Sequence, residues 1–255
     1  MSARAARIAL ITGAGSGIGA ALARRLAAPG VALALHARGA DDASRTRLAD
    51  VVHACTAAGA QCIALTGDLA DPGVAARLVD TTAAQFGGLD HLVANAGFAA
   101  RQSVSDLSAD ALASAFAAMP GAFATLASRA RPLLEASAAA RIVAVSSFVA
   151  HRYRADAPFA ATAAAKAALE SLVRSAAAEF APAAITVNAV APGFTRKDRG
   201  PSADNAGAWA HAAHATPLGR IAEPNDVAAL IAFLLSDAAR QITGQVVHVD
   251  GGLTL

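Results

Sequence analysis

The glycine-rich stretch at residues 12–19, Thr-Gly-Ala-Gly-Ser-Gly-Ile-Gly, is the part of the sequence whose residue types and spacing point most directly to chemistry. Its glycines permit a tight turn, close approach of a pyrophosphate and close packing of a helix on a strand. A helix that starts in such a turn offers backbone N–H groups to an anion. Plain strand-to-helix connections can also be glycine-rich, so context must decide. The predicted phosphate contacts are Gly13, Ser16, Gly17, Ile18 and Gly19.

The segments around this turn alternate between strand and helix patterns. Residues 7–11 are short, apolar and branched, as in a buried parallel strand, and residues 18–26 are rich in alanine and leucine, as in a helix. Successive strands are too far apart in sequence to form hairpins, so we expect parallel pairing. The sequence therefore predicts one doubly wound, Rossmann-like α/β domain over 1–255, with a parallel sheet of about seven strands and a ligand at their carboxyl ends. Further strands are expected at 31–36, 61–65, 89–93, 141–145, 185–189 and 246–249, and further helices through about 58 and at 74–86, 108–118, 121–136, 159–180 and 225–235.

Composition excludes several other classes of protein. The 255 residues are 55% hydrophobic, enough for a large core, and carry a net charge of +2 with only 16% charged residues, so no basic stripe indicates nucleic acid. The mean hydropathy of +0.44 comes largely from alanine, and no strongly apolar run reaches membrane-spanning length. Cys55 and Cys62 lack the spacing of a metal site, which favours a reducing compartment. We therefore expect a cytoplasmic protein that binds neither nucleic acid nor membrane.

Several further motifs follow predicted strands: Asn95-Ala96-Gly97, Ser146-Ser147, the run Val-Asn-Ala-Val-Ala-Pro-Gly at 187–193, and Val-Asp-Gly-Gly at 249–252. Together with the glycine turn, they make the chain resemble the short-chain dehydrogenase/reductase family over nearly its whole length. The resemblance implies a subunit that binds a nicotinamide dinucleotide. Asp68 and Asn95 could instead be turn formers. The further cofactor-binding residues implied by the resemblance are Asp68, Leu69, Asn95, Lys166, Pro192, Gly193 and Thr195.

The choice of cofactor depends on the end of the second strand, where the chain has His36-Ala37-Arg38. Ala37 offers no carboxylate to the ribose 2′-hydroxyl of NAD, whereas Arg38 can bind the 2′-phosphate of NADP. The alternative for Arg38 is a solvated arginine at the surface. The sequence thus favours NADP(H) over NAD(H).

The catalytic pattern of the family is only partly present. The resemblance implies a Tyr four residues before a Lys on one helix, so that the ammonium lowers the pKa of the phenol. The lysine is Lys166, one of only two lysines in the chain, but Thr162 occupies the tyrosine position. A threonine hydroxyl titrates far above a phenol, whose pKa is about 10, so Thr162 cannot replace it as an acid. Ala118 stands where the family usually has an Asn, and Ser147 remains as the carbonyl-binding hydroxyl or as a structural serine at a strand end.

Another side chain could supply the proton. Tyr153, the only tyrosine, lies on the predicted loop 151–156 between Arg152 and Arg154, whose charges could lower the pKa of its phenol. The alternative is an exposed loop tyrosine. His151 is a second candidate. We interpret Glu170, with Arg174 four residues later, as an exposed charged pair on the helix that carries Lys166.

Two functions remain open. One is an NADP(H)-dependent oxidoreductase that acts on a small alcohol or carbonyl substrate, and the other is a non-catalytic dinucleotide-binding sensor or partner subunit. A lid segment at 196–216, with Lys197, Arg199 and Trp209, should shape the substrate pocket. His211 and His214 in that segment lack a third ligand, so we expect no metal. Alanine-rich long helices favour a homodimer or homotetramer.

Overall fold

Seven parallel strands form a single sheet in the order β3-β2-β1-β4-β5-β6-β7 in the computed structural model, which describes residues 7–196 and 206–255. The order reverses between β1 and β4, and in such a sheet the ligand crevice lies outside the carboxyl ends of the strands at this switch point. The predicted fold class is confirmed. The strands are β1 Arg7–Ile11, β2 Val31–Ala37, β3 Gln61–Thr66, β4 His91–Ala94, β5 Arg141–Val145, β6 Thr186–Pro192 and β7 Val246–Val249.

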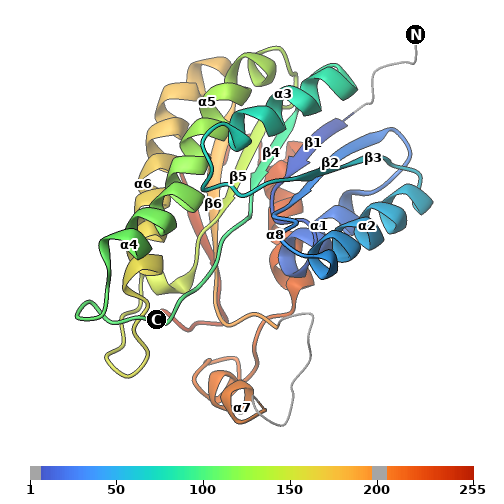
Figure 1. Cartoon of the computed structure of the whole chain (residues 1–255). Coiled ribbons are helices and arrows are strands. Elements are labelled where there is room, and N and C mark those ends of the chain that lie inside the picture. Colours follow the sequence, from blue (N-terminus) through green and yellow to red (C-terminus); the bar gives the residue numbers. More distant parts are fainter. Residues whose placement is uncertain (1–6, 197–205) are drawn as a thin grey trace.

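Helices cover both faces of the sheet (Figure 1). Helices α1, α2 and α8 lie on one face, where α1 packs on α2 and α8, whereas α3, α4, α5 and α6 lie on the other. Helix α7 lies beyond one end of the sheet. The helices are α1 Gly17–Leu26, α2 Asp42–Ala57, α3 Val74–Phe86, α4 Ala109–Phe116, α5 Ala122–Glu135, α6 Ala160–Phe180, α7 Ala206–His214 and α8 Pro224–Leu235.

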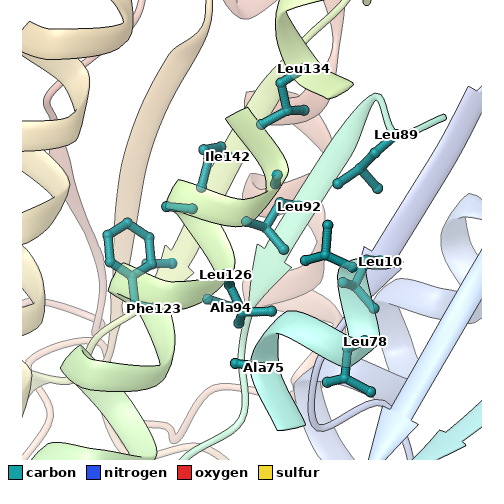
Figure 2. Packing of buried hydrophobic residues seen from close by; sticks show 14 of the residues in the cluster. Leu10, Ala75, Leu78, Leu89, Leu92, Ala94, Phe123, Leu126, Leu134 and Ile142 are labelled. Atoms are coloured by element: carbon teal, nitrogen blue, oxygen red, sulfur yellow. The ribbon is translucent and has the colours of Figure 1, made fainter. Parts of the chain in front are cut away.

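The core consists of two apolar layers, one on each face of the sheet. Leu10, Leu92 and Ile142 point from three neighbouring strands toward α3 and α5, where they meet Leu78 and Phe123 (Figure 2). The intervening strand residues point to the opposite face of the sheet, where they pack against α1, α2 and α8. Burial on both faces explains why β1, β2, β4, β5 and β6 have mostly apolar sequences.

Three segments differ from the sequence-based expectation. Strand β4 begins at His91 rather than 89, because the Asp90 carboxylate accepts the N–H of Ile8 at 2.8 Å. Helices α4 and α5 are continuous through a π-helical turn, Ala117–Gly121, that contains Pro120. The predicted polar segment 196–216 contains helix α7, and residues 197–205 of this segment lie outside the described residues.

The helical run Ala109–Glu135, which comprises α4, the π-helical turn and α5, is long and apolar enough to cross a membrane by length and composition. Core helices meet the same criterion. Met119, Phe123 and Leu126 of this run are buried within the described chain, and α5 packs against α3. Part of its apolar character therefore follows from packing inside the protein. Of the most apolar 18-residue window, 39% is buried inside the single chain.

Candidate functional site

The glycine turn adopts a backbone that only glycine accommodates well. Gly13 and Gly17 have φ values of 67° and 53°, in the left-handed region. A Cβ atom at Gly19 would lie 2.3 Å from the Gly13 carbonyl oxygen, whereas a Cβ at Gly17 would have no atom within 4 Å. The turn is therefore tight on the side of Gly19 and open at Gly17, where α1 begins. This geometry fits a pyrophosphate at the helix N-terminus.

Asn95, after β4, holds this turn in place. Its Nδ2 donates to the carbonyl oxygens of Thr12 and Gly13, at 2.9 and 3.1 Å. The Thr12 hydroxyl oxygen in turn accepts the N–H groups of Asn95 and Ala96, both at 3.0 Å. Asn95 thus links the end of β4 to the glycine turn across the switch point.

A cavity of about 1020 Å³ extends along the carboxyl ends of the strands. Nearly all of the sequence-predicted site residues line it, whereas Gly19 contributes by packing behind the turn. The chain carries these residues at the carboxyl ends of the first six strands and on helix α6, which the fold brings together. The predicted residues that line the cavity are Gly13, Ser16, Gly17, Ile18, Arg38, Asp68, Leu69, Asn95, Ser147, Thr162, Lys166, Pro192, Gly193 and Thr195.

The end of the cavity near β2 is rich in unpaired positive charge. Arg38, after β2, and Arg47, on α2, both line the cavity, and neither has an ion-pair or hydrogen-bond partner among the described residues. Ser44 lines the cavity beside them. Two arginines and a hydroxyl suit an anion such as a sugar phosphate. Sequence reasoning missed Ser44 and Arg47, although their place on the first turns of the helix after β2 was a usable signal.

His36, the last side chain but one of β2, is buried at the same end of the cavity. Its Nε2 lies 3.0 Å from the Gly67 carbonyl oxygen, and its Nδ1 is buried with no hydrogen-bond partner in the described chain. Burial lowers the pKa of His36, so the ring is neutral near pH 7. When Nε2–H donates to the Gly67 carbonyl oxygen, Nδ1 is a hydrogen-bond acceptor without a donor in the described chain. The amine of an adenine ring could donate a hydrogen bond to it. The residues present therefore fit a dinucleotide.

Lys166 lies at the opposite end of the cavity. Its Nζ is buried and donates to the Val145 carbonyl oxygen at 2.6 Å. Burial lowers the pKa of Lys166 to about 8, against the opposing influence of Glu170. A Cβ atom at Gly97 would lie 3.0 Å from Nζ, so glycine at 97 leaves room for the ammonium group.

Thr162 and Ser147 bring two hydroxyl groups to the same end. Thr162 lies one helical turn before Lys166, is 1% exposed, and accepts the Ala100 N–H at 3.1 Å. Ser147 accepts the Val149 N–H at 3.4 Å. Each oxygen acts as an acceptor in these bonds, so each hydroxyl proton is available for a ligand. Ala118, in the π-helical turn, lines the cavity with a methyl group only.

The structure does not bring Tyr153 to the site. Its side chain is 73% exposed, its hydroxyl donates to the Ala150 carbonyl oxygen at 2.8 Å, and it does not line the cavity. Arg152 anchors the loop by donating to the Leu253 carbonyl oxygen at 2.9 Å, and Arg154 pairs with Asp156. With these contacts, Tyr153 occupies the place of the alternative interpretation, an exposed loop tyrosine outside the cavity lining.

Glu170 also differs from its expected place. It is 3% exposed rather than part of a surface pair, and its Oε1 accepts the Ser146 hydroxyl at 2.5 Å. His151, which does not line the cavity, has its Nε2 2.8 Å from the same oxygen. Sequence reasoning missed this cluster because α6 is so rich in alanine that its buried face is not marked by large apolar residues.

The sequence also predicted a lid segment and no metal site. Within residues 7–196 and 206–255, no group of three or more His, Cys, Asp and Glu side chains could hold a metal ion. His211 and His214 lie on α7, and Trp209 of the same helix lies against the Arg196 guanidinium, 5.2 Å from the ring centroid. Lys197 and Arg199 lie outside the described residues.

Comparisons with known proteins agree with this geometry. The family model described as enoyl-(acyl carrier protein) reductase matches residues 13–254. A cis-4-hydroxycyclohexanecarboxylate dehydrogenase of Sinomonas cyclohexanicum is 40% identical over 98% of this chain and 97% of its own length. A short-chain dehydrogenase of Burkholderia cenocepacia J2315, solved in complex with NADP, is 36% identical, with a TM-score of 0.88 and 98% of each chain covered. The chain belongs to the short-chain dehydrogenase/reductase family, and its relatives are oxidoreductases.

Proposed function

We propose that the protein is an NADP(H)-dependent oxidoreductase that acts on a small alcohol or carbonyl substrate, with Lys166 in place of the tyrosine as the proton donor. The observation that carries this proposal is that the Lys166 side chain lines the cavity directly, with a threonine rather than a phenol one turn before it. When bound, the nicotinamide would supply or accept the hydride.

The preference for NADP(H) rests on the two unpaired arginines. Arg38 and Arg47 can make charge-assisted hydrogen bonds to a 2′-phosphate, and no carboxylate at position 37 is present for a ribose hydroxyl. The relative from Burkholderia cenocepacia was solved with NADP, which supports the same choice.

The chemistry at the other end follows from three polar groups. The Ser147 and Thr162 hydroxyls can donate to a substrate carbonyl oxygen and stabilise the negative charge that develops on it. With a pKa of about 8, Lys166 is mostly protonated at pH 7 and is a far stronger acid than an alcohol. Lys166 can therefore transfer a proton to the developing alkoxide.

The walls near these groups suggest a substrate with an apolar body. Phe98, Phe148, Phe159 and Phe194 line the cavity, and the rings of Phe148 and Phe194 are 4.8 Å apart. Aromatic walls favour apolar ligands with few polar groups. The relative from Sinomonas cyclohexanicum is a cis-4-hydroxycyclohexanecarboxylate dehydrogenase by name, which supports cyclic alcohols and ketones as the first substrates to test.

The test is a spectrophotometric assay of NADPH oxidation with cyclic ketones and activated carbonyls. We expect measurable turnover, a fall in kcat of about 10²–10⁴ for Lys166→Met, and little change for the control Tyr153→Phe. The dissociation constant of NADPH, followed by fluorescence, separates lost chemistry from lost binding. Tight NADPH binding without any turnover would instead favour the second candidate, a non-catalytic dinucleotide-binding protein.

Assembly is a further part of the proposal. Most of the apolar stretch within Ala109–Glu135 is not buried by the rest of the chain, and α6 beside it is rich in alanine, which permits close helix approach. We infer a homodimer or homotetramer that buries this surface.

A further inference from the structure

Glu170 is a buried carboxylate that the proposed chemistry does not yet use. It lies one helical turn after Lys166 on the buried face of α6, and it has hydrogen-bonded neighbours on two other elements. We propose that Glu170 and His151 form the path by which Lys166 exchanges protons with solvent. This inference rests on the proposed function, since it assigns to Lys166 the role of acid.

The inner end of the path lies at the end of β5. Val145, the last residue of β5, accepts the Lys166 ammonium, and the next residue, Ser146, lines the cavity and donates its hydroxyl to Glu170. Lys166 and Glu170, at i and i+4, share one face of α6, so their charges are neighbours. The carboxylate opposes the effect of burial on Lys166 and raises its pKa.

The outer end of the path is His151. Its Nε2 lies 2.8 Å from Glu170 Oε1, and its side chain is 28% exposed, so one ring bridges the buried carboxylate and the surface. The His248 ring of β7 lies 4.4 Å away, centroid to centroid, and is itself 3.6 Å from the Asp250 carboxylate. The groups that face Glu170 and His151 are thus the Lys166 ammonium, the Ser146 hydroxyl, the His248 ring and, beyond it, Asp250.

A purely structural role is the alternative to this path. The bonds of Glu170 also tie β5, the turn after it and α6 together, which would stabilise the fold without any proton transfer. Two features favour a functional role. Ala118 gives the cavity no polar side chain at the position where an amide could organise water, and the partly exposed His151 ring connects the buried Glu170 carboxylate to the surface.

The proton balance closes over one turnover. During reduction, hydride goes to the carbonyl carbon and the Lys166 ammonium gives one proton to the oxygen, which leaves a neutral amine. His151, protonated from solvent, gives its proton to the Glu170 carboxylate, and Glu170 then passes that proton to the amine, so that Glu170 and His151 end the cycle as they began it. The net change is one solvent proton consumed for each carbonyl reduced and each NADPH oxidised, and the reverse holds for alcohol oxidation.

The first experiment needs no activity. Because the chain has only two lysines, labelling with ¹³C,¹⁵N-lysine gives two sets of side-chain NMR signals, and Lys166→Arg assigns them. We expect Glu170→Gln, which keeps an acceptor for Ser146, to lower the pKa of Lys166 by about one unit. The control is Glu179→Gln on the same helix, an exposed partner of Arg131. An unchanged Lys166 pKa in Glu170→Gln would overturn the proposal.

The second experiment tests the path itself. We expect His151→Asn to slow the exchange of the Lys166 Nζ hydrogens with water at least about tenfold, and to slow NADPH-dependent reduction until imidazole is added to the buffer. His53→Asn, an exposed histidine on α2, is the control. Unchanged exchange in His151→Asn would refute the path. If the unmodified protein reduces no carbonyl, the proposed function fails, whereas the exchange measurement still decides whether the path exists.

Discussion

Acid should destabilise the protein through one buried histidine at the amino ends of the strands. His91, the first residue of β4, is 6% exposed, and its Nε2 is buried without a hydrogen-bond partner in the described chain. Burial lowers the pKa of His91 to about 4, from a usual value of 6.5, while Asp90, Arg7, Arg141 and Asp237 act on it with opposing signs. The folded state therefore binds this proton at lower pH than the unfolded state.

The sign and the size of the effect follow from linkage. Above pH 6.5 His91 is neutral in both states and does not change the free energy of unfolding. Between pH 6.5 and pH 4 the unfolded state binds the proton more readily than the folded state, so stability decreases as the pH is lowered. For a drop from pH 7 to pH 5, the His91 shift corresponds to a loss of about 2 kcal/mol in the free energy of unfolding.

Urea denaturation at the two pH values measures this loss. The variant His91→Phe, which keeps a ring of similar shape, should lose about 2 kcal/mol less than the unmodified protein on going from pH 7 to pH 5. The exposed His53→Asn should behave like the unmodified protein. Equal losses in the unmodified protein and His91→Phe would refute the reasoning, since His36, whose pKa burial also lowers, contributes equally to both.

Three further predictions concern the site and the assembly. Arg38→Ala and Arg47→Ala should each weaken NADPH binding roughly tenfold to hundredfold in fluorescence titrations and leave NADH little changed. Equal affinities of the unmodified protein for NADPH and NADH would contradict the assignment. Thr162→Tyr should raise the reductase rate by up to about 10²–10⁴ in the NADPH assay, with Ala118→Asn as a second step, because a phenol would then stand one turn before Lys166; an unchanged rate would show that Lys166 needs no phenol. Light scattering at micromolar concentration should give two or four times the chain mass of 25.2 kDa, and a monomer would count against the proposed interface.

The sequence predicted the architecture well because its signals are local. Each strand is a short apolar run between turn residues, and the glycine turn lies where a strand meets a helix, so order and parallel pairing follow from spacing. That the glycine turn and Asn95 line one cavity was predicted for the same reason. Gly13 and Gly17 lie in the turn after β1 and Asn95 follows β4, and the carboxyl ends of these neighbouring strands meet at one edge of the parallel sheet.

What the sequence did not predict depends on which face of an element is buried. Helix α6 is mostly alanine, so periodicity could not show that Glu170 is buried or that Arg174 is exposed. Helix α2 likewise has few large apolar residues, and the position of Arg47 beside the cavity was missed. The place of Tyr153 is set by the contact of its neighbour Arg152 with Leu253, about a hundred residues later, and no local rule predicts such a contact.

The bonds of Asn95 to the glycine turn also constrain the order in which the molecule can assemble. The turn lies near the amino terminus, but the side chain that fixes its shape is more than eighty residues later and follows the strand that pairs with β1. During synthesis, a chain shorter than about 95 residues can form the first strand–turn–helix unit but not the completed anion-binding loop. Closing this long-range contact is slow compared with local helix formation, so the ability to bind a dinucleotide should emerge late, together with the β1–β4 pairing that creates the switch point.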